Sequence, residues 1–192
     1  MKLVGSSVEI KAISGENIGD RLQLCWGHLD NWRGMEIVGK SSSWLEEANE
    51  VFSPTTFIAY ERSAPVGMVE FLPHGSIGGV GLCPCRVDEG RGEVAERYLM
   101  DAGFDNYLFI SCLFVSEGHQ GKGVGTALLR RLIDTIILGG YDGLLVYVAE
   151  RDEEWSGYIH WPAGPKEFYE KRGFSMLKTL HDPQGYILSY TV

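Results

Sequence analysis

A glycine-dense segment between an apolar run and an amphipathic run holds the residues best suited to chemistry in this 192-residue chain. Residues 107–115 are almost continuously apolar, and the segment that follows contains Gly121, Gly123 and Gly125. Glycines let the backbone approach a ligand closely and let several N–H groups point the same way. A helix that begins at residue 123 adds its first N–H groups and a partial positive charge. The pattern predicts a binding site for a phosphate or pyrophosphate, here called the cradle (residues 120–126).

The spacing of the glycines excludes two common phosphate-binding motifs. A P-loop needs Lys followed by Ser or Thr, but Lys122 is followed by Gly123. The dinucleotide fingerprint needs a third glycine where Leu128 stands. What remains is Gln120-x-x-Gly123-x-Gly125 directly after a strand, which resembles the acetyl-CoA pyrophosphate motif of the GNAT superfamily of N-acyltransferases. The alternative is an ordinary glycine-rich turn between a strand and a helix.

A second stretch, residues 166–174, is similar to the motif that closes the GNAT domain, often Phe-Tyr-Glu-Lys-x-Gly-Phe. It follows the strand after the cradle helix, in the order that the family has. The resemblance is specific over residues 107–174 and looser before Pro73. It implies an acetyl-CoA-dependent N-acetyltransferase in which an amine attacks the thioester directly, without a covalent enzyme intermediate. A cysteine or serine nucleophile has no local signature here, because Cys112 lies within the apolar run without an evident His partner.

The resemblance also implies which residues hold the cofactor. In the family two parallel strands separate, and the pantetheine arm pairs with the backbone of the first strand, which has unpaired N–H and C=O groups there. By position these backbone groups belong to Leu113, Phe114 and Val115. The pyrophosphate-binding residues are then Gln120, Gly121, Lys122, Gly123, Val124, Gly125 and Thr126.

Tyr169 matches the position of the family's usual general acid. The tetrahedral intermediate expels a thiolate, and alkyl thiols have a pKa near 8.5 while Tyr has one near 10, so proton donation is uphill by only about 2 kcal/mol. A positioned phenol can therefore protonate the sulfur or stabilise it by hydrogen bonding. The alternative is that Tyr169 only packs beside Phe168 as an aromatic core residue.

The base that deprotonates the amine is less clearly marked. Glu70, on a strand predicted over residues 66–72, could act directly or through water, and alternation places it on the same face as Met68. The alternative is a solvated carboxylate. Glu117, Glu150 and His119 are weaker candidates, and His119 is expected to face solvent.

One position departs from the family pattern. Pro162 stands where many members carry an Asn that bonds the cofactor arm. The neighbouring His160 and Trp161 belong either to a loop that lines the acceptor pocket or to an ordinary surface loop.

Composition narrows the function classes. The net charge of −9, without a basic run, argues against nucleic-acid binding. Neither a membrane-spanning run nor a signal peptide is evident, which predicts a cytoplasmic protein with no membrane partner. The cysteines, at positions 25, 83, 85 and 112, do not suggest a disulfide scaffold. Cys83-Pro84-Cys85 is too closely spaced for structural zinc and lacks a second pair, so no metal is predicted.

We predict a single α/β domain over residues 1–192, with an insertion at 73–106 that is too short for a core of its own. Hydrophobic periodicity predicts a mixed twisted sheet with parallel central strands and helices on both faces. The predicted strands are 8–13, 55–60, 66–72, 107–115, 144–149, 175–180 and 186–190. The predicted helices are 17–31, 44–52 (capped by Ser43 with Glu46), 93–102, 123–138 and one that Pro165 opens and Gly173 closes.

Several functional alternatives stay open at this point. The runner-up is a catalytically silent acyl-CoA-binding or sensing domain, and transfer of a longer acyl group is a third reading. The acceptor is an amine of a small molecule or a protein: polyamine, amino acid, antibiotic, protein N-terminus or lysine all fit. The family often forms dimers, so the resemblance also allows a homodimer.

Overall fold

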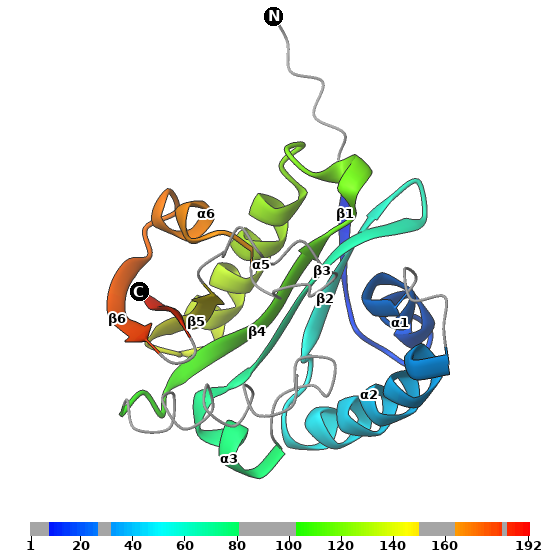
Figure 1. The fold of residues 1–192 in the computed structure, drawn as a ribbon, viewed down its shortest axis with the longest axis horizontal. Coiled ribbons are helices and arrows are strands. Elements are labelled where there is room, and N and C mark those ends of the chain that lie inside the picture. Colours follow the sequence, from blue (N-terminus) through cyan, green and yellow to red (C-terminus); the bar gives the residue numbers. More distant parts are fainter. Residues whose placement is uncertain (1–7, 27–31, 81–102, 150–163, 182–183) are drawn as a thin grey trace, which may run out of the picture.

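The computed structural model describes residues 8–26, 32–80, 103–149, 164–181 and 184–192 (Figure 1). A seven-stranded sheet runs through these residues in the order β1-β2-β3-β4-β5-β7-β6. The β4–β5 pair is parallel, and each other neighbouring pair is antiparallel. This confirms the predicted α/β class, a mixed sheet with a parallel pair at its centre. The strands are β1 (Glu9–Ala12), β2 (Thr56–Glu61), β3 (Ala64–Pro73), β4 (Tyr107–Val115), β5 (Gly143–Ala149), β6 (Ser175–His181) and β7 (Gln184–Thr191).

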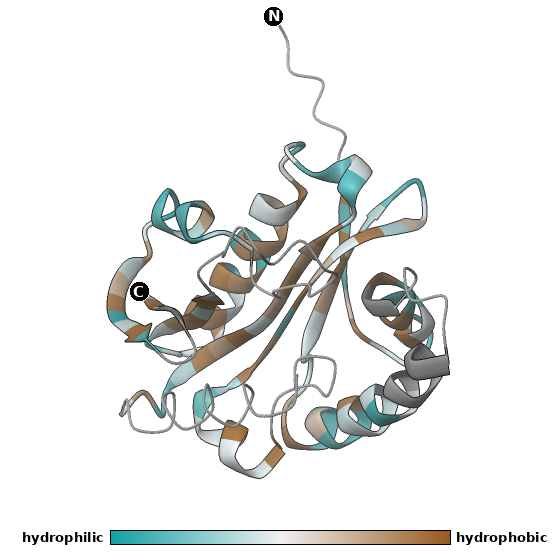
Figure 2. Cartoon of the chain, viewed as in Figure 1, coloured by the Kyte–Doolittle hydropathy of each residue, from teal (hydrophilic) through white to brown (hydrophobic). Residues whose placement is uncertain are grey.

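Helices cover both faces of the sheet. The α-helices are α1 (Ile18–Trp26), α2 (Trp32–Val51), α3 (Ile77–Val80), α5 (Val124–Gly139) and α6 (Lys166–Glu170), and two short 3-10 turns are η1 (His74–Ser76) and η3 (Glu117–His119). Helices α1 and α2 lie on one side of the sheet and α5 on the other (Figure 1). The hydrophobic residues run along the central strands and α5 (Figure 2).

Alternating side chains divide the core into layers on the two faces. On the α5 face, Leu128, Leu132 and Ile136 are fully buried in one cluster with Val69, Phe71 and other residues of the central strands. On the opposite face, Leu24 of α1 and Leu45 of α2 form a cluster with Met68. Glu70 lies two residues after Met68 in the same strand and belongs to that second face, as the alternation predicts.

The helix that precedes β2 is longer than predicted. We expected a start at Trp44 with Ser43 as its cap, but α2 begins at Trp32, so the capping-box prediction is wrong. Ser43 lies inside the helix, and its hydroxyl donates to the carbonyl of Gly39 one turn earlier. A serine bonded to the preceding turn is compatible with a helix interior, and a local cap pattern does not distinguish the two settings.

The hairpin between β2 and β3 is tighter than predicted. Arg62 and Ser63 form the turn with φ of 49° and 69°, and Ala64 and Pro65 already belong to β3. Two consecutive left-handed residues match the twist of an antiparallel pair. Of the predicted insertion at 73–106, only its two ends are described, as η1 with α3 and as the approach to β4; the predicted helix 93–102 and Cys83-Pro84-Cys85 lie outside the described residues.

Candidate active site

The parallel strands β4 and β5 separate partway along their length. Their pairing runs from Tyr107↔Gly143 to Ile110↔Val146 and then stops, although β4 continues to Val115 and β5 to Ala149. Beyond Ile110, β4 remains paired with β3, and β5 remains paired with β7. Residues 111–115 of β4, here called the splayed segment, therefore have no described strand beside them on the β5 side. The predicted cofactor-pairing residues Leu113, Phe114 and Val115 lie in this segment.

A bulge in β4 marks the point of separation. The register with β3 changes from Phe71↔Ile110 to Glu70↔Cys112, so Ser111 is the extra residue. The side chains reverse their faces there: Leu108 and Ile110 lie in the α5-side cluster, whereas Cys112 lies in the cluster under α1 and α2. A bulge bends its strand and increases the local twist, which turns β4 away from β5.

The cradle follows the splayed segment after η3, and its residues 120–123 are exposed. Gly121 and Gly123 have φ of 72° and 89°, a left-handed conformation that favours glycine. Gly123 caps α5 without a side-chain hydrogen bond, and the first intrahelical bond across it is from the Ala127 N–H to the Gly123 carbonyl, 2.9 Å. The N–H groups of residues 124–126 precede the Ala127 donor and, as at any helix start, have no acceptor one turn earlier within the helix. Such N–H groups and the positive end of the helix dipole favour an anion, and the binding of a pyrophosphate here stays a prediction.

Polar contacts hold the turn before the cradle, residues 116–119, against the hairpin of β2 and β3. The Gln120 Nε2 donates to the carbonyl of Val115 at 3.0 Å, and the Ser116 N–H donates to the carbonyl of Val66 at 2.9 Å. His119 was expected to face solvent, but its Nε2 lies 3.3 Å from a carboxylate oxygen of Glu61, and the side chain is only 28% exposed. The turn before the cradle is therefore held at both ends.

The short helix α6 lies against the first turn of α5. A Cβ at Gly125 would lie 3.4 Å from the Phe168 ring, so the two elements are in close contact. Arg172 ties them together: its Nη2 donates to Thr126 Oγ1 at 2.6 Å, its Nη1 donates to the Phe168 carbonyl, and its guanidinium lies 3.8 Å from the centre of the Phe168 ring. Sequence analysis missed this role, because Arg172 occupies a variable position of the closing motif.

Tyr169 sits in the core beneath this contact. The residue has no exposed surface, its hydroxyl oxygen is buried, and its ring meets Phe168 and Phe174 edge-on, each at 5.1 Å between ring centres. It belongs to the same buried cluster as Val124 of α5 and Val146 of β5. The aromatic-core description of Tyr169 is thus correct for its packing. The catalytic role stays a prediction. The packing holds the ring in a fixed position, as a catalytic phenol would require.

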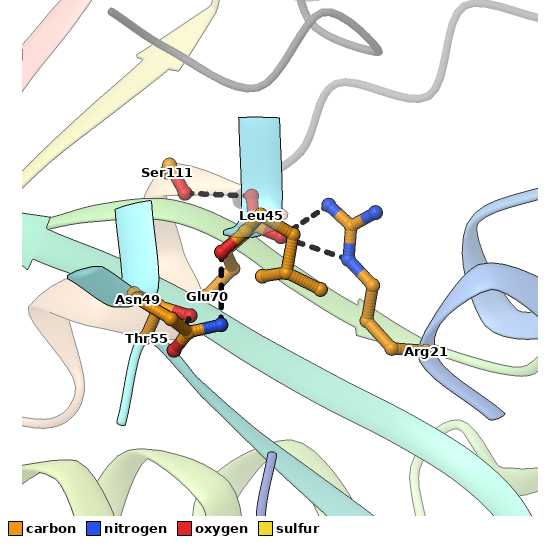
Figure 3. Close-up of polar contacts among 6 residues, drawn as sticks. All are labelled: Arg21, Leu45, Asn49, Thr55, Glu70 and Ser111. Carbon is orange, nitrogen blue, oxygen red and sulfur yellow. Dashed lines mark hydrogen bonds and ion pairs between the residues drawn. The ribbon is translucent and has the colours of Figure 1, made fainter. Parts of the chain in front are cut away.

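Glu70 is buried rather than solvated, so the alternative of a solvent-facing carboxylate is wrong. Its Oε2 accepts from Arg21 Nε at 3.1 Å and from Arg21 Nη2 at 2.5 Å, and its Oε1 accepts from Ser111 Oγ at 3.0 Å. Figure 3 shows the carboxylate between these two side chains. The role of Glu70 as the base stays a prediction. Arg21 was missed, although its place three residues after Ile18 and three before Leu24 puts a charge on the apolar stripe of α1, which signals a buried partner.

Other predicted positions contribute less to the site. His160, Trp161, Pro162 and Glu150 lie outside the described residues. Cys112 is buried and forms no disulfide with another described residue. Within the described ranges, no three His, Cys, Asp or Glu side chains are grouped as metal ligands would be, and no helix has the length and apolar character to cross a bilayer.

Comparison with known proteins agrees with this geometry. A model of the acetyltransferase (GNAT) domain matches residues 53–176. Among solved structures, the ribosomal-protein-alanine N-acetyltransferase of Brucella melitensis superposes with a TM-score of 0.62 at 14% identity, covering 96% of this chain and 99% of that one. The PaiA N-acetyltransferase of Thermoplasma acidophilum, in complex with coenzyme A, gives 0.60 at 13% identity, covering 97% and 99%.

Arabidopsis thaliana Naa50, in complex with a bisubstrate analogue, gives a TM-score of 0.57 at 16% identity, covering 97% of this chain and 99% of that one. At these identities the three structures show a shared fold. A search of curated proteins found no significant sequence match.

Proposed function

Because the chain belongs to the GNAT family of acetyltransferases, we propose that it transfers an acetyl group from acetyl-CoA to a primary amine. One observation carries this proposal: the β4–β5 pair ends at Ile110, and β4 runs on from there into the glycine cradle. Coenzyme A joins an extended, amide-bearing arm to a pyrophosphate. The arm matches the splayed segment of β4, and the pyrophosphate matches the glycine cradle that follows it.

The two surfaces divide the cofactor between them. The splayed segment offers backbone groups of Leu113, Phe114 and Val115 to the amides of the pantetheine arm, in the manner of an added strand. The cradle, from Gln120 to Thr126, offers main-chain N–H groups to the pyrophosphate, and the exposed Lys122 adds a positive charge. Arg172 contributes indirectly, since its bonds to Thr126 and Phe168 hold the first turn of α5 in place.

In the proposed reaction the neutral amine attacks the thioester carbonyl to form a tetrahedral intermediate. A C–N bond forms, and collapse of the intermediate breaks the C–S bond. The nitrogen loses one proton, and the departing sulfur gains one. We assign the donor of that second proton to Tyr169, whose hydroxyl is buried beside the start of α5. Transfer of the phenol proton to the thiolate is uphill by only about 2 kcal/mol, as the pKa values of phenol and thiol require.

Replacement of the phenol tests this assignment. We expect Tyr169→Phe to lower kcat by about 10²–10⁴-fold, the range for loss of a general acid, while the Kd of acetyl-CoA changes by less than about twofold. Calorimetry gives the Kd, and release of free thiol from acetyl-CoA gives kcat. Tyr141→Phe is the matched control, because Tyr141 lies past the far end of α5 and packs against Phe52. Equal turnover of Tyr169→Phe and the wild type would remove Tyr169 from the mechanism.

The alternative, a silent acyl-CoA-binding domain, predicts a different result for the wild type. Such a domain binds acetyl-CoA but releases no thiol with any amine. A panel of polyamines, amino acids, aminoglycoside-type antibiotics and peptides with free N-termini or lysines decides between the two and identifies the acceptor class. Peptides that begin with alanine belong in the panel, since one fold relative is a ribosomal-protein-alanine N-acetyltransferase. Running the panel with longer acyl-CoA thioesters fixes the acyl preference.

A further inference from the structure

A polar cluster is buried in the sheet at the point where β4 leaves β5. Arg21, Thr56 and Glu70 have no exposed surface, and Ser111 is 3% exposed. Thr56 is the direct cross-strand partner of Glu70, and Ser111 is the bulge residue beside it. Charged groups are rarely buried to this extent unless they are paired, and a polar cluster costs stability relative to an apolar one. Because this cluster lowers stability, its position beside the β4–β5 separation points to a function there.

The hydrogen bond from Ser111 to Glu70 joins the bulge to the neighbouring strand. An extra residue in a strand loses its regular place in the backbone pairing, so its side chain is free to adopt several orientations. Here the Ser111 hydroxyl donates to Glu70 Oε1 at 3.0 Å, which fixes the bulge against β3 (Figure 3). The splayed segment begins at this residue, so the contact lies at the point where β4 turns away from β5.

Arg21 connects the same carboxylate to α1. Its two bonds to Glu70 Oε2 span 49 residues of sequence and join α1 to β3 beside the bulge. The guanidinium also lies 6.0 Å from the ring centre of Trp44, between α1 and α2. The position of these helices and the shape of the β4–β5 separation thus depend on one carboxylate. Both of its oxygens accept hydrogen bonds from this chain, so the charge of the carboxylate is already paired within the fold.

We propose that Arg21, Glu70 and Ser111 are positioning residues that hold the splayed segment in the geometry that accepts the acetyl-CoA arm, and that Glu70 acts in this way rather than as the base. The proposal rests on the proposed function, because it assumes that acetyl-CoA binds along residues 111–115. It assigns the three residues an effect on cofactor affinity, which a general base would not have.

The serine gives the mildest test. Ser111→Ala removes the hydroxyl but leaves the ion pair, and we expect the Kd of acetyl-CoA to rise about tenfold, the equivalent of one hydrogen bond to a charged group. Ser111→Thr keeps the hydroxyl and should recover most of the affinity. The matched control is Thr56→Val, which removes a buried hydroxyl that bonds to no described residue and faces the same cluster. Wild-type affinity in both Ser111 variants would overturn the proposal.

A variant of Glu70 distinguishes a positioning role from a role as the general base. Glu70→Gln should raise the Kd of acetyl-CoA by tenfold or more, with a pH profile of kcat that keeps its wild-type shape. An unchanged Kd together with a loss of kcat and of the acidic limb of its pH profile would instead make Glu70 the base and overturn the proposal. Circular dichroism and thermal melts confirm that each variant is folded.

Glu70→Gln leaves the Arg21 charge buried beside a neutral partner and could unfold the protein. The double variant Arg21→Met with Glu70→Met removes both charges, and such replacements are often neutral or stabilising. We expect it to fold and still bind acetyl-CoA at least tenfold more weakly than the wild type. A folded double variant with wild-type affinity contradicts the positioning role. Failure of the wild type itself to bind acetyl-CoA contradicts the proposed function, so the two failures are distinguishable.

Discussion

A single phenol links the second strand to the first helix. The Tyr60 hydroxyl donates to a carboxylate oxygen of Asp20 at 2.7 Å, and burial together with this hydrogen bond raises the pKa of Tyr60 to about 12. In the unfolded chain the same group titrates near 10. The folded state therefore favours the protonated phenol, and the stability that this provides is complete below pH 10 and lost as the pH rises toward 12.

Tyr60→Phe tests this linkage. We expect the variant to be less stable by about 1 kcal/mol at pH 7, because it lacks the hydrogen bond to Asp20. The difference in the free energy of unfolding between the two proteins should narrow as the pH rises from 10 to 12. Only the wild type releases a proton on unfolding in this pH range. Urea denaturation at several pH values measures both effects. A gap that stays constant up to pH 12 would show that the phenol titrates normally in the folded protein.

Residues that act through their immediate neighbours in sequence were predictable. A glycine-rich turn that leads into a helix was predicted from residues 120–126 alone, and Gly121 and Gly123 have the positive φ that glycine tolerates. Residues that act across the fold were not. The Ser111 hydroxyl and the Arg21 guanidinium meet Glu70 across 41 and 49 residues, and nothing local to any of the three marks the others as partners.

The turn that joins β4 to α5 depends on glycine unequally along its length. Gly123 has a φ of 89°, so Gly123→Ala should cost about 1–2 kcal/mol of stability and lower acetyl-CoA affinity about tenfold or more by distorting the cradle. Gly118, which precedes the cradle, has no positive φ, and no atom lies within 4 Å of an added Cβ.

Gly118→Ala is therefore the matched control and should bind acetyl-CoA as the wild type does. Chemical denaturation and calorimetry measure the two variants. Equal affinities for Gly123→Ala and Gly118→Ala would mean that the backbone shape of the cradle does not govern binding.

The boundaries of helices and strands were predictable where glycine or another turn-forming residue ends the element. The helix predicted over residues 123–138 is α5, which ends because Gly140 adopts a left-handed φ of 70°. The strand predicted over 107–115 matches β4. The bulge within it was not predictable, because a strand buried on both faces is apolar throughout and its sequence does not show which face each side chain takes. The start of α2 was missed because Ser43 and Glu46 have the spacing of a helix cap, although the helix continues through both residues.

At Gly143, the first residue of β5, the backbones of neighbouring strands approach each other closely. Gly143 pairs with Thr191 of β7 and with Tyr107 of β4, and an added Cβ would lie 2.6 Å from the Tyr107 ring and in collision with the Tyr190 carbonyl. We expect Gly143→Ala to destabilise the protein by about 2–3 kcal/mol, since the backbone must shift to admit it.

Gly19→Ala, at an exposed position in α1 with nothing nearby, should leave stability unchanged or raise it slightly. Thermal melts of the two alanine variants measure the contrast. Similar melting temperatures would show that β5 and β7 can separate without cost at this end.

At the scale of the molecule, the class of the fold followed from the order of its elements, and the strand order did not. A strand, a helix and a strand with apolar faces imply the parallel β4–β5 pair. The C-terminal hairpin was also predicted, but its second strand, β7, lies between β5 and β6. Both strands of the hairpin carry apolar residues, so its sequence alone does not decide which of them docks on β5.

The separation of β4 from β5 leaves a strand edge within the sheet. Exposed edges invite other chains to pair with them, and no described strand lies along this one on the β5 side. Bound acetyl-CoA would therefore serve as a missing strand. At a hundredfold excess over its Kd it would add about 2.7 kcal/mol to the free energy of unfolding. The empty protein would be the form most prone to aggregate, so purification and storage should go best with the nucleotide present.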